Sequence, residues 1–183
     1  MHMISASIFS RRVALTFLSL VMLPVIASAA TSQAWLLVSG AWNDSIITTD
    51  QKERDRLKRE DWKISGTGLL QSSAKPGAVP LHRMFNAGPK SFGRLLETRP
   101  ANVAARVKAG FIDEGVLGYV ASEEKPGLVP VYHFVKEDKH FWLIDPKDKD
   151  TAERNGWKED GISFWLWPVG SAESSATASP KKS

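Results

Sequence analysis

The chain has 183 residues, no cysteine and a formal net charge of +4. The absence of cysteine excludes a disulfide scaffold, a catalytic thiol and a lipid attached through a cysteine. The positive charge is too small to indicate nucleic-acid binding.

Residues 1–30 are predicted to be a signal peptide. Arg11 and Arg12 precede an apolar run at 13–26, and small residues follow at 27–30. This order is typical of secretory export, with a twin-arginine signal as the alternative. The run is shorter than the roughly 20 residues that span a bilayer. We therefore expect no integral membrane segment after cleavage, and a location in the periplasm or outside the cell.

The chain that remains after cleavage has the size of one domain. It would contain 153 residues with a net charge of about +2, enough for a hydrophobic core without disulfides. We place this single domain at 31–170. The segment 171–183 is rich in small and polar residues, which is typical of a disordered tail.

Two patterns indicate internal repeats. The segment KPGAVPL at 75–81 recurs 50 residues later as KPGLVPV at 125–131. An aromatic residue, three residues and a glycine recur at 62–66, 111–115 and 157–161, with spacings of 49 and 46. Periods of this size indicate several copies of one supersecondary unit.

Each repeat is predicted to hold a strand, a second extended segment, a short helix and a closing strand. Pro100 at a first helical position and Gly110 beyond the helix support this order. The first strands are expected at 79–85 and 129–135, and the second segments at 45–49, 94–97 and 140–145. The helices are expected at 50–60, 101–109 and 146–155, and the closing strands at 67–71, 116–121 and 162–167.

The position of the first strand predicts how the repeats assemble. Residues 34–50 align without a gap on 129–145, so the N-terminal strand is expected to complete the last repeat. The repeats then span about 34–85, 86–134 and 135–170. A ring closed in this way has no open sheet edge. The sequence thus predicts a mainly β, three-fold pseudo-symmetric, β-trefoil-like body with one short helix per repeat. An open array of three repeats is the alternative.

Several segments resemble a repeat of secreted bacterial proteins whose pattern runs P-L-Y-R-F, H-F-Y-T-T, E-R-D and G-W-x-x-E-G-I. The matching segments are PVYHF at 130–134, HFW at 140–142, GWKEDGI at 156–162 and FIDEGV at 111–116. Members of this uncharacterised family often stand beside hydrolase domains. The resemblance implies a non-catalytic accessory module.

A ligand-binding surface is predicted at Trp42, His140 and Trp142. The repeat alignment places Trp42 opposite the charged Glu137, which indicates an exposed position, and Trp142 opposite Ile47. His140 lies two residues before Trp142, so both side chains face the same way on a strand. An exposed aromatic ring beside a polar group is typical of a binding surface.

No other pattern indicates chemistry. The histidines lack the spacing of a zinc site, the aspartates at 145, 148 and 150 lack the glycine and distal glutamate of a calcium loop, and no catalytic motif is found. We expect no enzymatic activity, no metal ion and no cofactor.

These observations favour an exported module that binds glycan of the cell envelope or the environment. The surplus of tryptophan, seven in all, and the family resemblance support this interpretation. The alternative is a periplasmic inhibitor or immunity protein that docks on a toxin or hydrolase. Its support is the single small domain, because accessory modules usually accompany a catalytic partner.

Overall fold

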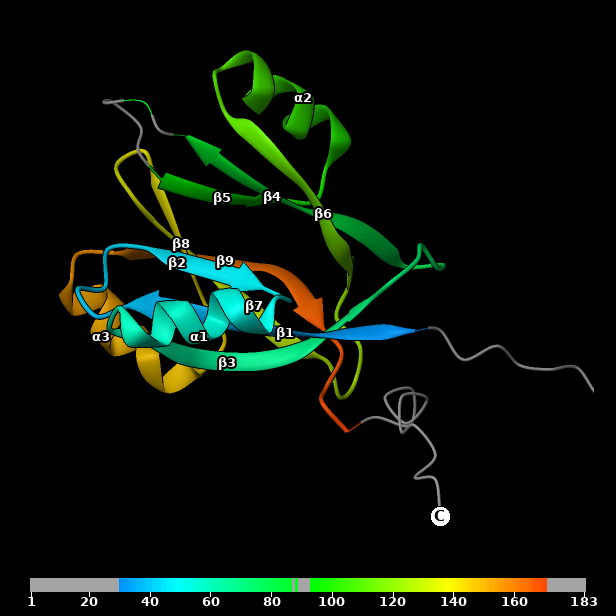
Figure 1. Cartoon of the computed structure of the whole chain (residues 1–183), viewed down its shortest axis with the longest axis horizontal. Helices are drawn as coiled ribbons and strands as arrows, with labels where there is room; N and C mark the ends of the chain where they lie inside the picture. The colour runs from blue at the N-terminus through cyan, green and yellow to red at the C-terminus, as the bar shows by residue number, and fades with distance from the viewer. Residues whose placement is uncertain (1–29, 87, 89–92, 171–183) are drawn as a thin grey trace, which may run out of the picture.

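The computed structural model describes residues 30–86, 88 and 93–170. The predicted signal peptide, apart from residue 30, and the predicted tail lie outside the described residues. The fold consists of three consecutive units with the same order of elements (Figure 1). Unit 1 contains β1 (Thr31–Ser39), β2 (Ser45–Thr48), α1 (Gln51–Arg59) and β3 (Trp62–Gln71). Unit 2 contains β4 (Ala78–Asn86), β5 (Gly93–Glu97), α2 (Pro100–Lys108) and β6 (Ile112–Ala121). Unit 3 contains β7 (Val129–Lys136), β8 (Lys139–Leu143), the 3₁₀ turn η1 (Pro146–Asp148), α3 (Lys149–Arg154) and β9 (Lys158–Leu166).

This order confirms the prediction of a mainly β chain with one short helix per repeat. The helix starts follow from local chemistry. The side chain of Asp50 accepts a hydrogen bond from the backbone N–H of Lys52, and Asp145 caps η1 in the same way through Lys147. Pro100 opens α2, where its missing N–H costs nothing.

The first strand of every unit is its central strand. β1 pairs with β2 and β3, β4 with β5 and β6, and β7 with β8 and β9, always in antiparallel orientation. Each unit is therefore a three-stranded sheet whose helix joins its two outer strands. The central strand of each unit is therefore hydrogen-bonded on both sides within its own unit.

The three units meet at the ends of their closing strands. Gln71 pairs with Tyr119, Ala121 with Trp165, and Leu69 forms an isolated bridge with Trp167. The strand order is β2-β1-β3-β6-β9-β7-β8, with β4 and β5 attached through β6. Figure 1 shows the unit of β4, β5, β6 and α2 standing apart from the rest of the fold.

The prediction of a closed body is wrong, because the sheet is open and trefoil symmetry is not shown. The N-terminal strand was expected to complete the last repeat, but β1 uses its hydrogen bonds within unit 1. The strand pairings therefore place the boundaries between units within 72–77 and within 122–128, whereas the sequence predicted these boundaries at residues 85 and 134.

The ungapped alignment failed because the first hairpin has a longer loop. Trp35 pairs with Thr67, as Tyr132 pairs with Ile162, so Trp35 matches Tyr132 and not Pro130. Contacts support this match, since the Arg54 guanidinium lies 4.4 Å from the Trp35 ring and the Lys149 ammonium 3.6 Å from the Tyr132 ring. The loop between β1 and β2 is two residues longer than the turn between β7 and β8.

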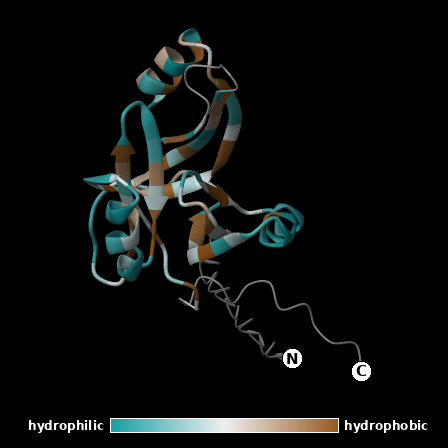
Figure 2. Cartoon of the chain, turned by 90° about the vertical axis from the view of Figure 1, so that its left-hand side faces the viewer, coloured by the Kyte–Doolittle hydropathy of each residue, from teal (hydrophilic) through white to brown (hydrophobic). Residues whose placement is uncertain are grey.

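Trp157 anchors the core of unit 3, as its place in the repeat predicts. Its ring is 4% exposed and stacks on Phe141 with ring centroids 4.9 Å apart. Its Nε1–H donates to the backbone carbonyl of Trp42 over 2.7 Å. The equivalent aromatic residues Trp62 and Phe111 are half-buried and pack against the edge of the core. Figure 2 shows the hydrophobic residues concentrated on the strands, while the helices are largely hydrophilic.

Unit 3 is tied to unit 1 by buried hydrogen bonds. The backbone N–H of Trp142 donates to Ser45 Oγ over 2.8 Å, across a sequence separation of 97 residues. The backbone N–H of Ile144 donates to Ser65 Oγ over 3.2 Å. Ile144 also lies so close to Gly66 that a Cβ there would come within 2.4 Å of its side chain. The junction of units 3 and 1 is therefore closely packed.

Trp157→Ala should lower the free energy of unfolding by about 3–5 kcal/mol, because the change leaves a large cavity beside Phe141. Ile112→Ala is the matched control on an outer strand, since Ile112 is 60% exposed, and should stay within about 0.5 kcal/mol of the parent. Equilibrium unfolding in urea measures both. Parent-like stability of the Trp157 variant would contradict its role as a core anchor.

Candidate functional site

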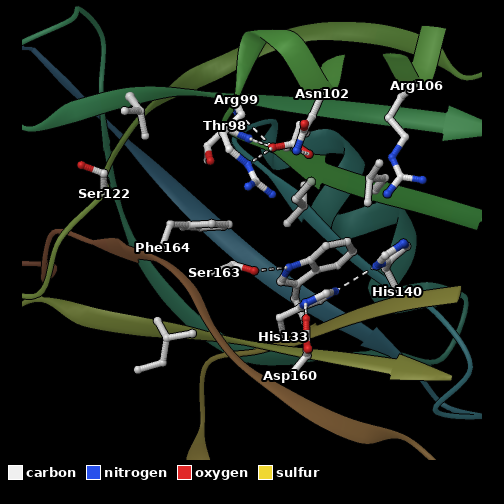
Figure 3. A pocket seen from close by; sticks show the side chains of 16 residues that line it. Thr98, Arg99, Asn102, Arg106, Ser122, His133, His140, Asp160, Ser163 and Phe164 are labelled. Carbon is white, nitrogen blue, oxygen red and sulfur yellow. Dashed lines mark hydrogen bonds and ion pairs between the residues drawn. The ribbon is translucent and has the colours of Figure 1, made fainter. Parts of the chain in front are cut away.

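A cleft of about 570 Å³ lies between units 2 and 3. One wall is the corner where β5 leads into α2, and the other is formed by β7, β8 and β9 (Figure 3). The lining combines aliphatic, aromatic, cationic, acidic and amide side chains, namely Val79, Leu95, Leu96, Glu97, Thr98, Arg99, Asn102, Arg106, Ser122, His133, His140, Trp142, Asp160, Ile162, Ser163 and Phe164. We take this cleft as the candidate functional site because it offers many polar groups beside a cluster of rings.

Three stacked rings form one wall of the cleft. The centroid of His133 lies 5.1 Å from that of His140 and 5.1 Å from that of Trp142, with interplanar angles of 12° and 23°. His133 on β7 pairs directly with Trp142 on β8, and His140 shares the face of Trp142 because the two residues are two positions apart. The β7–β8 hairpin thus brings the three rings together.

A chain of hydrogen bonds sets the protonation of both histidines. An Asp160 oxygen lies 3.0 Å from His133 Nδ1, and His133 Nε2 lies 2.9 Å from His140 Nδ1. An ionised carboxylate only accepts, so His133 Nδ1 donates, and a neutral His133 accepts at Nε2 from His140. His140 Nε2 is then left as an acceptor.

Burial keeps both imidazoles neutral. It lowers the pKa of His133, although the charge of Asp160 acts in the opposite direction. For His140, burial together with the positive charges of His133 and Arg106 lowers the pKa from 6.5 to about 4. Because a buried imidazolium would lose its hydration, both rings offer hydrogen-bonding and stacking groups without charge at neutral pH.

Glu97 holds the opposite wall in place. Its Oε1 accepts hydrogen bonds from the backbone N–H groups of Thr98 and Arg99, each over 2.9 Å, and its Oε2 accepts from Asn102 Nδ2 over 2.9 Å. Burial disfavours the charge, but these bonds keep the pKa of Glu97 below its ordinary value. An engaged carboxylate of this kind positions the strand-to-helix corner and is a poor proton donor.

One residue that lines the cleft differs between equivalent junctions. Arg83 on β4 is the equivalent of His133 on β7. Each residue pairs with the second strand of its own unit, and each contacts the acidic residue that lies three positions after the aromatic residue of that repeat. Arg83 also crosses to unit 1, where it bonds Glu53 over 2.8 Å and the Ile47 carbonyl over 3.3 Å.

His133 is shorter and bonds only within unit 3. A depression of about 440 Å³ remains at the junction that Arg83 crosses. The corresponding position of unit 1, which the strand registers assign to Leu36, is fully buried. Of the three junctions, that between units 2 and 3 thus lacks a bridging side chain at this position, and it holds the larger cleft.

The structure brings together two of the three predicted site residues. His140 and Trp142 stack with ring centroids 5.9 Å apart and both line the cleft. Trp142 is only 2% exposed, so it is part of the wall and not the exposed platform that the alignment indicated. Its Nε1–H donates to Ser163 Oγ over 3.2 Å.

Trp42 lies elsewhere. It contacts Phe141, with ring centroids 6.2 Å apart, and Phe141 faces away from Trp142 because consecutive strand residues alternate. Its backbone has a φ of 53°, as Glu137 has 56° in the equivalent turn. The indole is half-buried against the core, and it does not join the rings of His140 and Trp142.

Sequence reasoning missed His133 and the whole of the α2 wall. His133 belongs to the PVYHF segment, but its pairing with Trp142 depends on the turn that joins β7 and β8. Glu97, Asn102 and Arg106 reach the site through the packing of unit 2 on unit 3, for which the sequence pattern contains no signal.

Two further findings describe the resolved part of the chain. Within residues 30–86, 88 and 93–170, no three His, Asp or Glu side chains form a group suited to a metal ion. None of the helices in these ranges has the length and apolar composition required to cross a membrane.

The stability of the fold should fall as the pH drops from about 6.5 to about 4. In this window the unfolded state protonates His140 while the folded state does not, so protons favour unfolding. His140→Asn should remove part of this slope in urea unfolding measured across the pH range. A titration of the His140 ring by NMR should have its midpoint near 4, and a midpoint near 6.5 would contradict the described burial.

Comparisons with known proteins give one match. A family model described as "Domain of unknown function (DUF5648)" matches residues 35–167, which include all three units and both walls of the cleft. No curated protein and no solved structure matches the chain.

Proposed function

The chain belongs to the DUF5648 family, and we propose that it is an exported, non-catalytic module that binds a saccharide in the cleft between units 2 and 3. The observation that carries the proposal is the composition of this cleft. Stacked rings lie on one wall, and planar polar groups of Arg99, Asn102 and Arg106 lie on the other.

This composition suits a sugar because a sugar has two kinds of surface. Its C–H groups pack against aromatic and imidazole rings, and its hydroxyl groups need donors and acceptors in fixed positions. The neutral His140 supplies an acceptor, and Asn102 and the arginines supply donors. A cavity of about 570 Å³ is of the size that small-ligand sites have.

The sequence supports two parts of this proposal, namely that the module is exported and that it is not catalytic. The N-terminal pattern at 1–30 indicates export to the periplasm or beyond. The resemblance to repeats that accompany secreted hydrolases favours an accessory role. Glu97 is engaged by three donors, and Asp160 is bonded to His133. The cleft therefore offers no carboxylic acid prepared for proton transfer.

His133→Arg tests the proposal directly. Arginine is the residue of the equivalent position in unit 2, so the longer, charged side chain should fit the fold, break the ring stack and extend into the cleft. Calorimetric titration with peptidoglycan fragments and oligosaccharides should show binding to the parent and at least about a tenfold loss in the variant. His82→Asn, which changes a histidine outside the cleft, is the control and should bind as the parent does.

Parallel capture from an envelope extract separates the two classes of partner. The proposal would be overturned if the parent captures a protein that the His133→Arg variant also captures, and if the parent binds no saccharide. That result would favour the inhibitor interpretation.

A further inference from the structure

We infer that the saccharide bound in the cleft is acidic, and that Arg99 and Arg106 recognise its carboxylate groups. This inference rests on the proposed function and adds the class of ligand. Figure 3 shows both side chains extending from the α2 wall into the cleft, with Arg106 on the side of the His140 ring. The ligand would lie between the guanidinium groups and the ring stack.

The two arginines lie on one side of the α2 wall. Arg99 is the N-cap of α2 and Arg106 is in its last turn. Seven residues are almost two full turns of a helix and rise by about 10 Å. Two cations at this spacing suit a chain that has repeated negative charges, and an extended acidic oligosaccharide has this property.

Arg99 forms a long ion pair with Glu97, whereas Arg106 has no carboxylate partner among the described residues. The Arg99 side chain is 78% exposed, and its Nε lies 3.6 Å from Glu97 Oε1, an oxygen that already accepts two backbone hydrogen bonds. The Arg106 guanidinium lies 5.7 Å from the Phe111 ring centroid. Among the described residues, Arg106 forms no ion pair, so its hydrogen-bond donors are available to a ligand.

Of the two acidic residues that line the cleft, Glu97 belongs to the α2 wall and Asp160 to the ring wall. Glu97 is 8% exposed and is held by its three donors. Asp160 belongs to the other wall, where it bonds His133. Because Glu97 is buried and Arg99 is exposed, the accessible charge on the α2 wall is positive. The Arg106 charge also reaches His140, because it contributes to the lowered pKa of that ring.

The test uses oligogalacturonate, oligoglucuronate and oligomannuronate, each compared with its carboxyl-reduced form, in which CH₂OH replaces the carboxylate. In calorimetric titrations at low salt, at least one acid should bind about tenfold or more tightly than its reduced form, as expected for a charged hydrogen bond. Arg99→Gln and Arg106→Gln should each remove most of this preference, because affinity for the acid should fall further than affinity for the reduced form.

Two controls separate recognition from stability. Arg59→Gln changes an exposed arginine on α1, outside the cleft, and should keep the preference. Arg106→Lys keeps the charge and should keep a smaller preference, even if Arg106→Gln melts earlier than the parent. In NMR titrations, the bound acid should raise the pKa of His140, because the carboxylate cancels the field of Arg106.

Equal affinity for acid and reduced forms, with both lost in His133→Arg, would overturn the inference and leave the proposed function standing. An acid preference that survives both glutamine substitutions would also overturn it. Binding of no acidic or neutral saccharide at all would overturn the proposed function as well.

Discussion

The pairing of each unit's first strand with both of its other strands is the constraint on which the rest of the structure depends. It satisfies the central strand of every unit on both sides within that unit. Between units, the strands pair through single pairs of residues at the ends of β3, β6 and β9. The space between the units is consequently filled by side chains, and its shape depends on their identity.

The three junctions show what this freedom allows. Arg83 bridges units 1 and 2, close packing of Ile144 on Gly66 seals units 3 and 1, and His133 leaves units 2 and 3 apart. The same fold thus contains one junction that a side chain bridges, one that is closely packed and one that holds the cleft. A function confined to one junction follows from this difference, and it agrees with the lack of a residue set repeated in all three units.

Much of the fold could be predicted from local signals. The period identified the units, and Pro100 and Asp50 mark where helices begin. The register of β1 could not be predicted, because it depends on a hairpin loop whose length an ungapped alignment does not reveal. This error placed Trp35 opposite Pro130 and suggested a closed ring.

The site could be predicted only where it depends on spacing along one strand. The two-residue interval between His140 and Trp142 correctly placed both on one face. The position of His133 required the pairing of two strands, and that of Arg106 required the packing of two units. Trp42 was misplaced because its charged counterpart Glu137 indicated exposure, whereas the longer loop lets Trp42 pack on Phe141.

The buried bond between Ser45 and Trp142 has a consequence for how the molecule folds. No residue of unit 1 lines the cleft, yet unit 1 holds the backbone of Trp142 from a distance of 97 residues along the chain. Contacts of such separation form late, since a long loop must first close. Synthesis from the N-terminus delivers Ser45 before Trp142, so this bond can form only after β8 has been made. A nascent chain halted after unit 2 would contain the α2 wall of the cleft but not the opposite wall, which unit 3 supplies.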